Sequence, residues 1–158
     1  MDTQKSITKF FAASAFFFIW VTLQGAIQAQ QPVHQFLELG PAGIIVGAHV
    51  HIGTLGWIGM GMMGLFYYLV PKVSGKELSW PGLVNGIFWV DFIVVVLNGV
   101  LMIAAGVAGG RAVQAGLSGE AVNAAIGPYM MFIGIVSLLC GLVSLLYAVQ
   151  IIHTLVKK

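Results

Sequence analysis

The distribution of charged residues constrains this chain more than any other sequence feature. Four long stretches carry almost no charge, with Asp91 as the only exception: 10–37, 39–71, 78–110 and 121–156. A membrane-spanning helix needs about 20 consecutive, mostly apolar residues. The sequence therefore predicts four transmembrane helices, near residues 9–29, 41–70, 82–108 and 128–153.

Composition supports the same class. Only 8% of the 158 residues are charged and 59% are hydrophobic, whereas about 25% of an average soluble domain is charged. So few charges cannot cover a soluble core of this size, but a lipid bilayer needs no such cover. We expect a single all-α domain, an integral membrane four-helix bundle. No basic run with interleaved aromatic residues is present, so nucleic acid is not an expected partner.

Prolines and glycines indicate where these helices begin and end. Pro41 is expected to open the second helix and Pro71 to close it, and residues 74–77 form a turn. Pro128 suits the first turn of the fourth helix, where the missing N–H is tolerated. Four glycines indicate a loop between the third and fourth helices: Gly109, Gly110, Gly116 and Gly119.

Lysine placement predicts the orientation. Six lysines lie at the two termini and in the second connection: Lys5, Lys9, Lys72, Lys76, Lys157 and Lys158. The first connection has no Lys or Arg, and the third has only Arg111. The positive-inside rule then places both termini in the cytoplasm. The basic start followed by residues 10–23 also resembles a signal peptide, but we expect this segment to be a retained span.

The second predicted helix contains a His-x-His pair, His49 and His51, between Gly47 and Gly53. At about 100° per residue the two side chains point roughly 200° apart, so they cannot bind one metal ion together from a regular helix. They can serve two centres, one on each side. A histidine inside a membrane span is costly without a partner, which favours a functional role. The alternative is a neutral histidine hydrogen-bonded to a neighbouring helix.

Glycines follow the histidine pair at short intervals: Gly53, Gly56, Gly59, Gly61 and Gly64. Gly53 and Gly56 share a face with His49. Their missing side chains would leave room for a flat macrocycle beside the imidazole. The competing interpretation is close helix–helix packing through small residues, and both can hold along one helix.

This pattern resembles a known family. The segment 47–59 and the later Tyr-Tyr-Leu-Val-Pro-Lys at 67–72 resemble the tenth helix of the catalytic subunit of haem–copper oxidases, closest to cbb-type oxidases and bacterial nitric oxide reductases. The flanks at 22–25 and 88–89 are also similar. In that family the first histidine binds the high-spin haem and the second binds the low-spin haem. The resemblance implies that His49 and His51 are ligands to haem iron, with one or two haem b groups.

The departures from the family matter equally. Its catalytic subunit has about twelve helices, and this chain has four. The helix with the other low-spin ligand and the three histidines for copper or non-haem iron have no counterpart here. The chain resembles the last third of that scaffold, standing as a separate protein. We expect the missing axial ligand to come from a partner or a symmetry mate, with His34, Met130 or Met131 as alternatives.

Other polar residues have two interpretations each. Arg111 could pair with haem propionates or serve only in topology and loop ion pairs. Asp91 could relay protons, with Asn98 two turns away, or form a structural hydrogen bond between helices. Three residues are expected as anchors at the membrane interface: Tyr67, Tyr68 and Trp80. His153 is expected in a capping or interfacial role.

Together these features favour a membrane-embedded b-type haem subunit that carries electrons in a respiratory complex, without catalytic residues of its own. Its partners would be other membrane subunits or further copies, with a periplasmic cytochrome or a quinol as electron partner. The location would be the inner membrane of a bacterium or archaeon. A second hypothesis is a split part of an oxidase or nitric oxide reductase, with the catalytic metal ligands on other chains. A third is a structural subunit without haem.

Overall fold

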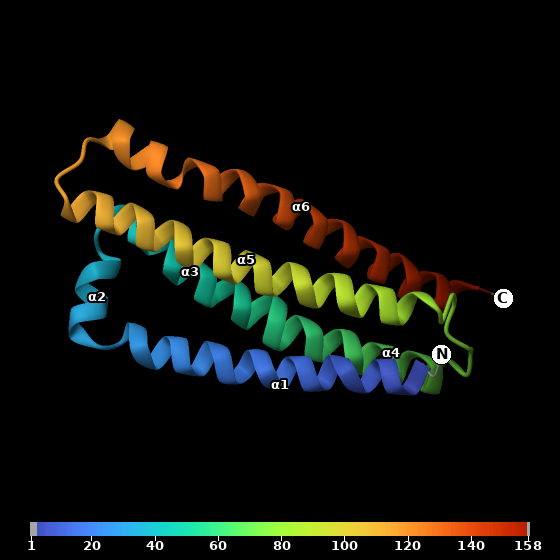
Figure 1. Cartoon of the computed structure of the whole chain (residues 1–158). Coiled ribbons are helices and arrows are strands. Elements are labelled where there is room, and N and C mark those ends of the chain that lie inside the picture. The colour runs from blue at the N-terminus through green and yellow to red at the C-terminus, as the bar shows by residue number, and fades with distance from the viewer. Residues whose placement is uncertain (1–2, 158) are drawn as a thin grey trace.

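The computed structural model describes residues 3–157 and shows a bundle of four long, antiparallel helices (Figure 1). The first is α1 (Thr3–Gln28), and short α2 (Gln31–Leu37) follows it. The second long helix is continuous from Gly40 to Ser74. Its parts are η1 (Gly40–Gly43), α3 (Ile44–His51), η2 (Ile52–Gly59) and α4 (Met60–Ser74). The last two are α5 (Leu83–Gln114) and α6 (Gly119–Val156).

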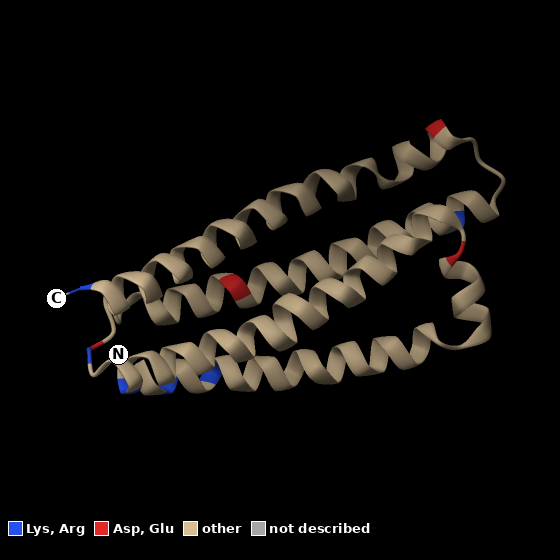
Figure 2. Ribbon diagram, turned by 180° about the vertical axis from the view of Figure 1, so that it is seen from behind, with Lys and Arg blue, Asp and Glu red and all other residues tan. Residues whose placement is uncertain are grey.

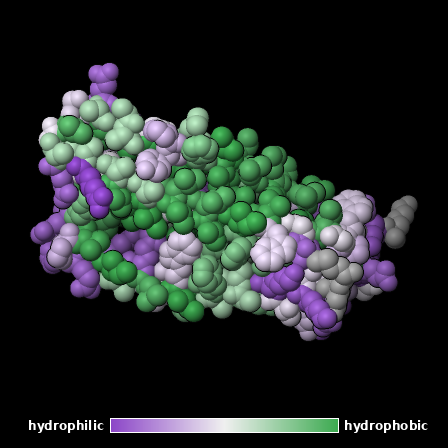
Figure 3. All heavy atoms as spheres, viewed as in Figure 1, coloured by the Kyte–Doolittle hydropathy of each residue, from purple (hydrophilic) through white to green (hydrophobic). Residues whose placement is uncertain are grey.

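All four long helices are sufficiently long and apolar to cross a membrane, and the described residues include no β-strand. The predicted all-α membrane bundle is therefore confirmed. Both termini lie at the same end of the bundle (Figure 1). Most of the Lys and Arg positions gather at that end (Figure 2), whereas Arg111 lies in the last turn of α5, at the other end. Hydrophobic side chains cover the middle of the face seen in Figure 3, with hydrophilic ones towards both ends. Which end faces the cytoplasm stays a prediction.

An aromatic core joins the first helix to the others. Phe10 and Phe17 of α1 are fully buried, and the Phe10 ring packs against Tyr67 and Phe88 with centroid distances of 5.5 and 5.2 Å. Tyr67 comes from α4 and Phe88 from α5, so one α1 side chain connects three helices. The first apolar stretch is thus part of the packed core, as expected of a membrane span.

The predicted helix ends need correction at both prolines. Pro71 does not close the second long helix, because α4 continues to Ser74 and ends at Gly75, whose φ of 66° suits a glycine C-cap. Pro128 is likewise not in a first turn. Helix α6 begins at Gly119, where the Ser118 side chain accepts a hydrogen bond from the N–H of Ala121. Membrane helices tolerate internal proline where neighbouring groups satisfy the freed backbone atoms.

Gly109 and Gly110 are also not in a loop, because α5 continues to Gln114. A Cβ atom at Gly109 would lie 2.5 Å from Pro41 Cβ, and one at Gly110 would meet the Phe36 ring. These glycines therefore allow the start of the second long helix and α2 to pack closely on α5. Arg111 consequently lies in the last turn of α5 rather than in a loop.

Candidate functional site

The histidine pair lies where the helix changes its hydrogen-bonding pattern. Helix α3 ends at His51, and η2, which follows without a break, is a π-helix. Such i→i+5 segments are rare and are found frequently at functional sites. The Ser14 hydroxyl of α1 donates a hydrogen bond of 2.7 Å to the carbonyl of Trp57 inside η2. The altered backbone is therefore held from outside by the first helix.

The His51 imidazole is half-buried and lies 2.9 Å, through Nδ1, from the carbonyl oxygen of Gly47. A carbonyl oxygen only accepts, so Nδ1 carries the proton and donates it. Nε2 is then unprotonated and free to bind a metal ion, the arrangement in which metal-binding histidines are usually held. His51 lines a cavity of about 240 Å³ among the second long helix, α5 and α6, together with Asn98, Ser137 and Cys140.

The His49 imidazole is half-buried on the opposite side, against α1. A Cβ atom at Gly25 would lie 3.0 Å from its Cε1 atom, so a glycine at this point of α1 leaves room for the ring. Within the part of the chain that the structure describes, His49 Nδ1 is buried without a hydrogen-bond partner. His49 lines a cavity of about 490 Å³ with Gly25 and Gly53. The two imidazoles thus belong to separate cavities.

The other predicted cofactor residues are placed differently. Gly53 lies in the His49 cavity, but Gly56 is buried where a Cβ atom would be 2.5 Å from Phe17 Cγ. That contact favours the helix-packing interpretation of Gly56. His34 is exposed on α2, 3.6 Å from the Glu38 carboxylate, and Arg111 is exposed. Neither lines the His49 or His51 cavity, so their roles towards haem stay predictions.

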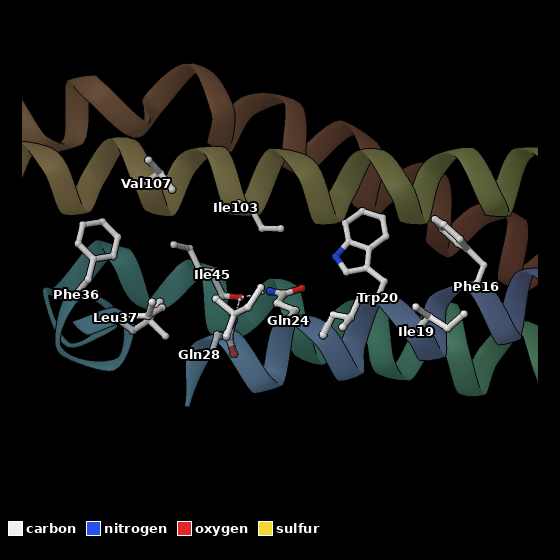
Figure 4. A pocket seen from close by; sticks show the side chains of 13 residues that line it. Phe16, Ile19, Trp20, Gln24, Gln28, Phe36, Leu37, Ile45, Ile103 and Val107 are labelled. Atoms are coloured by element: carbon white, nitrogen blue, oxygen red, sulfur yellow. Dashed lines mark hydrogen bonds between the residues drawn. The ribbon is translucent and has the colours of Figure 1, made fainter. Parts of the chain in front are cut away.

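A larger cavity of about 610 Å³ lies apart from both imidazoles, between α1, α2, α3 and α5 (Figure 4). Its walls are mainly apolar, with Trp20 and Phe36 on opposite sides of the view. Gln24 and Gln28 both donate to the carbonyl of Ile45, at 3.2 Å. These amides join α1 to α3 on the side of the bundle where His34 lies.

A buried polar network at the lysine-rich end was not anticipated from the sequence. The Gln150 side chain of α6 is fully buried, accepts a hydrogen bond of 2.8 Å from the Tyr67 hydroxyl, and donates to the carbonyls of Ser79 and Trp80. Tyr67 is 1% exposed, so its prediction as an interfacial anchor is wrong. The sequence feature that could have revealed this network is Gln150 itself, because a glutamine inside an apolar span requires hydrogen-bond partners within the protein.

His153 is adjacent to this network. Its ring stacks on Trp80 with a centroid distance of 4.4 Å, and its Nδ1 lies 2.9 Å from the Ser79 hydroxyl. The side chain therefore fixes the connection between α4 and α5 to the end of α6.

Two half-buried imidazoles thus lie on opposite sides of a glycine-rich helix that is long and apolar enough to cross a membrane. Comparison with known proteins identifies the family of the chain. The model of the family described as cytochrome c and quinol oxidase polypeptide I matches residues 1–139. The chain belongs to this family, that of haem–copper oxidase subunit I, which confirms the resemblance inferred from the sequence.

Individual relatives are bacterial oxidase subunits. The cbb3-type cytochrome c oxidase subunit CcoN1 of Stutzerimonas stutzeri is 37% identical over 92 residues, which are 58% of this chain and 19% of that protein. The cytochrome c oxidase subunit 1 homolog of Agrobacterium tumefaciens (strain T37) is 42% identical over 60 residues, 37% of this chain and 11% of the relative. The cytochrome c oxidase subunit 1 of Rhodobacter capsulatus is 44% identical over 50 residues, which are 31% of this chain and 9% of the relative. The matched region thus spans a fifth or less of each relative.

Proposed function

We propose that this chain is a b-type haem-binding subunit that carries electrons within a respiratory membrane complex. The observation that carries the proposal is the position of His49 and His51, each beside its own cavity on opposite faces of one helix. Haem supplies the one-electron chemistry, and the protein supplies an axial ligand, a dry environment and the electrostatics that set the potential.

The hydrogen-bonding state of the two imidazoles supports this proposal. His51 donates through Nδ1 to Gly47, which orients the ring and leaves Nε2 to bind iron. His49 has a buried Nδ1 without a partner in the described chain, and Gly25 of α1 leaves room for its ring. A buried polar atom without a partner is costly, and an imidazole retained at that cost indicates a ligand role.

The second axial ligand of a six-coordinate iron comes, in this proposal, from another membrane subunit or from a second copy of the chain. His34 supplements it as a ligand at the edge of the bundle, and Arg111 pairs with haem propionates at the same end. The sequence predicts Gly53 and Gly56 on the haem face, and of the two only Gly53 lines a cavity together with a histidine. A quinol or a periplasmic cytochrome is the electron partner, and the membrane is the bacterial or archaeal inner membrane.

A second candidate function is supported by the comparisons. Relatives named as oxidase subunit 1 match over a fifth or less of their length. The chain would then be one part of an oxidase or nitric oxide reductase, with the catalytic metal ligands on other chains. Co-purification with a chain of six or more spans and several histidines would favour this function over an electron-transfer subunit.

Optical spectra of the purified protein, oxidised and reduced, test the proposal, with pyridine haemochrome analysis to give haem type and number. We expect a haem b spectrum that loses intensity or changes spin state in both His49→Ala and His51→Ala. His153→Gln is the matched control, because Gln keeps a polar partner for Ser79 and should leave the spectrum unchanged. A protein without a Soret band would refute haem binding, and a band that both alanine variants leave unaltered would refute ligation by this histidine pair.

A further inference from the structure

A groove between α1 and α5 at the lysine-rich end is separate from the two histidine cavities. It encloses about 380 Å³, and neither His49 nor His51 lines it. Most of its lining consists of aromatic rings, Phe16 from α1 and Phe88, Trp89 and Phe92 from α5. The rest is two alanines and a single charged side chain, all from α1. An apolar groove with one charge in it has the character of a binding site.

The charged side chain is Lys9, which contacts α5 in two ways. Its Nζ atom donates a hydrogen bond of 2.8 Å to Asn85 Oδ1. The same atom lies 5.9 Å from the centroid of the Phe88 ring and 5.5 Å from that of the Trp89 ring, within the range of cation–π contacts. An ammonium group has three N–H donors. Because Asn85 accepts from one of them, two are left for a ligand.

The charge of Lys9 has no acidic partner among residues 3–157. The same holds, within these residues, for Lys5, which lies one turn earlier on α1. Lys9 is half-buried, and a charged group at membrane depth is costly unless another group compensates it. The described chain provides a hydrogen bond and two aromatic faces, but it provides no negative charge. An anion from outside the chain would supply what is missing.

Lys9 and Trp89 indicate the depth of the groove in the membrane. Helices α1 and α5 both start at the lysine-rich end (Figure 1), and each of the two residues is the seventh of its helix. Six steps at helical rise are about 9 Å. Tryptophan rings and lysine side chains with apolar stems are typical of the boundary between lipid headgroups and hydrocarbon. An anion bound to Lys9 would therefore lie at the level of the headgroups.

From that level the groove continues towards the middle of the bundle. Phe16 lies seven residues beyond Lys9 on α1, or about 10 Å at helical rise. Its ring centroid is 6.0 Å from that of Phe92 on α5, so this pair lines the inner part of the groove. Between Lys9 and Phe16, Ala12 and Ala13 add only methyl groups to the lining. A cation followed by an apolar groove suits a phosphate group that carries a hydrocarbon chain.

We propose that this groove binds one anionic phospholipid, with its phosphate at Lys9 and the first part of one acyl chain against Phe16, Phe88 and Phe92. Lys5, which is exposed one turn earlier, adds positive charge beside the headgroup. The lipid supplies the counter-charge of Lys9 and connects α1 to α5 at the lysine-rich end. Because the groove is separate from both histidine cavities, the proposal does not depend on haem binding.

The test is native mass spectrometry of the purified full chain, titrated with phosphatidylglycerol or with phosphatidylcholine of identical acyl chains. We expect the first phosphatidylglycerol molecule to bind at least about fivefold more tightly, the contribution of one lysine at an anionic membrane surface. Lys9→Gln keeps a hydrogen-bond donor for Asn85 and should lower this preference about fivefold. Lys157→Gln is the matched control, because it removes the same charge at the same end of the bundle but outside the groove. It should leave the preference unchanged.

A second variant tests the acyl chain separately from the phosphate. Ala12→Leu fills the groove without changing the charge, so it should weaken the binding of both lipids by the same factor. Ala15→Leu, at an exposed position of α1 outside the groove, should leave both affinities unchanged. Equal affinities of the wild type for the two lipids, an undiminished preference in Lys9→Gln, or unaltered binding in Ala12→Leu would overturn the proposal. Displacement of phosphatidylglycerol by excess inorganic phosphate would also overturn it, because the site would then recognise a free anion.

Discussion

Gly56→Ala distinguishes the two interpretations of the glycines that follow the histidine pair. In the structure a Cβ atom at this position would lie 2.5 Å from Cγ and 2.7 Å from Cδ1 of Phe17. Ordinary contacts of this kind are 3.4–4 Å, so the ring or the helix must move by about 1 Å. Phe17 is fully buried and packs on Trp20 and Phe92. The core therefore offers the ring little space to move.

Overpacking of this kind costs about 1–3 kcal/mol. Replacing a helical glycine by alanine recovers up to about 1 kcal/mol of helix propensity. We therefore expect Gly56→Ala to lower the free energy of unfolding by about 1–2 kcal/mol. Gly134→Ala in α6 is the matched control, because nothing lies within 4 Å of its Cβ position. It should be neutral or slightly stabilising.

Unfolding in mixed micelles of increasing SDS content, followed by circular dichroism, measures both variants with and without haem. If Gly56 serves helix packing, the loss of stability is the same in both states. Equal stability of Gly56→Ala and Gly134→Ala in the haem-free protein would refute the packing argument. A change confined to the haem spectrum would instead assign Gly56 to the cofactor face.

Three further expectations follow from the structure. Gly25→Ala should weaken haem retention at His49 two- to tenfold and leave retention at His51 unchanged. The alanine Cβ would displace the His49 imidazole at a cost of about 0.5–1.5 kcal/mol. Equal effects on both haem signals in spectral titrations would contradict this. Gln150→Met should lower the free energy of unfolding by about 2 kcal/mol, because it removes three hydrogen bonds of about 0.6 kcal/mol each. In a double-mutant cycle measured by SDS unfolding, its cost should combine less than additively with that of Tyr67→Phe. Additive costs would refute the coupling between the two side chains. Fusions at either terminus should be active with green fluorescent protein and inactive with alkaline phosphatase, and the reverse pattern would invert the predicted orientation.

The sequence predicted the membrane class and the four spans because charge-free length is a direct consequence of bilayer thickness. It also placed the two histidines on opposite faces, since that follows from helical spacing alone. The helix boundaries predicted at Pro71, Pro128 and Gly109 are wrong, because the rules for helix termination come from soluble proteins. In a membrane the helix continues, because breaking backbone hydrogen bonds in lipid costs more than a local distortion.

The polar side chains of α6 that contact α5, and the Gln150 network, were missed for a different reason. Ser, Cys and single Gln residues scarcely alter a hydropathy profile, so an apolar span conceals them unless their spacing is compared with a helix face. Tyr67 shows the same limit. The sequence suggests an interfacial tyrosine, but only packing shows that Gln150 and Phe10 enclose it.

The π-helical segment η2 also changes the relation between the two halves of the second long helix. Each i→i+5 bond encloses one residue more than an α-helical bond, so residues after Gly59 are rotated relative to a helical wheel continued from His51. Because of this rotation, the histidines face one set of neighbours while Tyr67, further along the same helix, faces another. A one-residue change in its length would rotate the histidine pair away from its surroundings without altering a single residue that touches them.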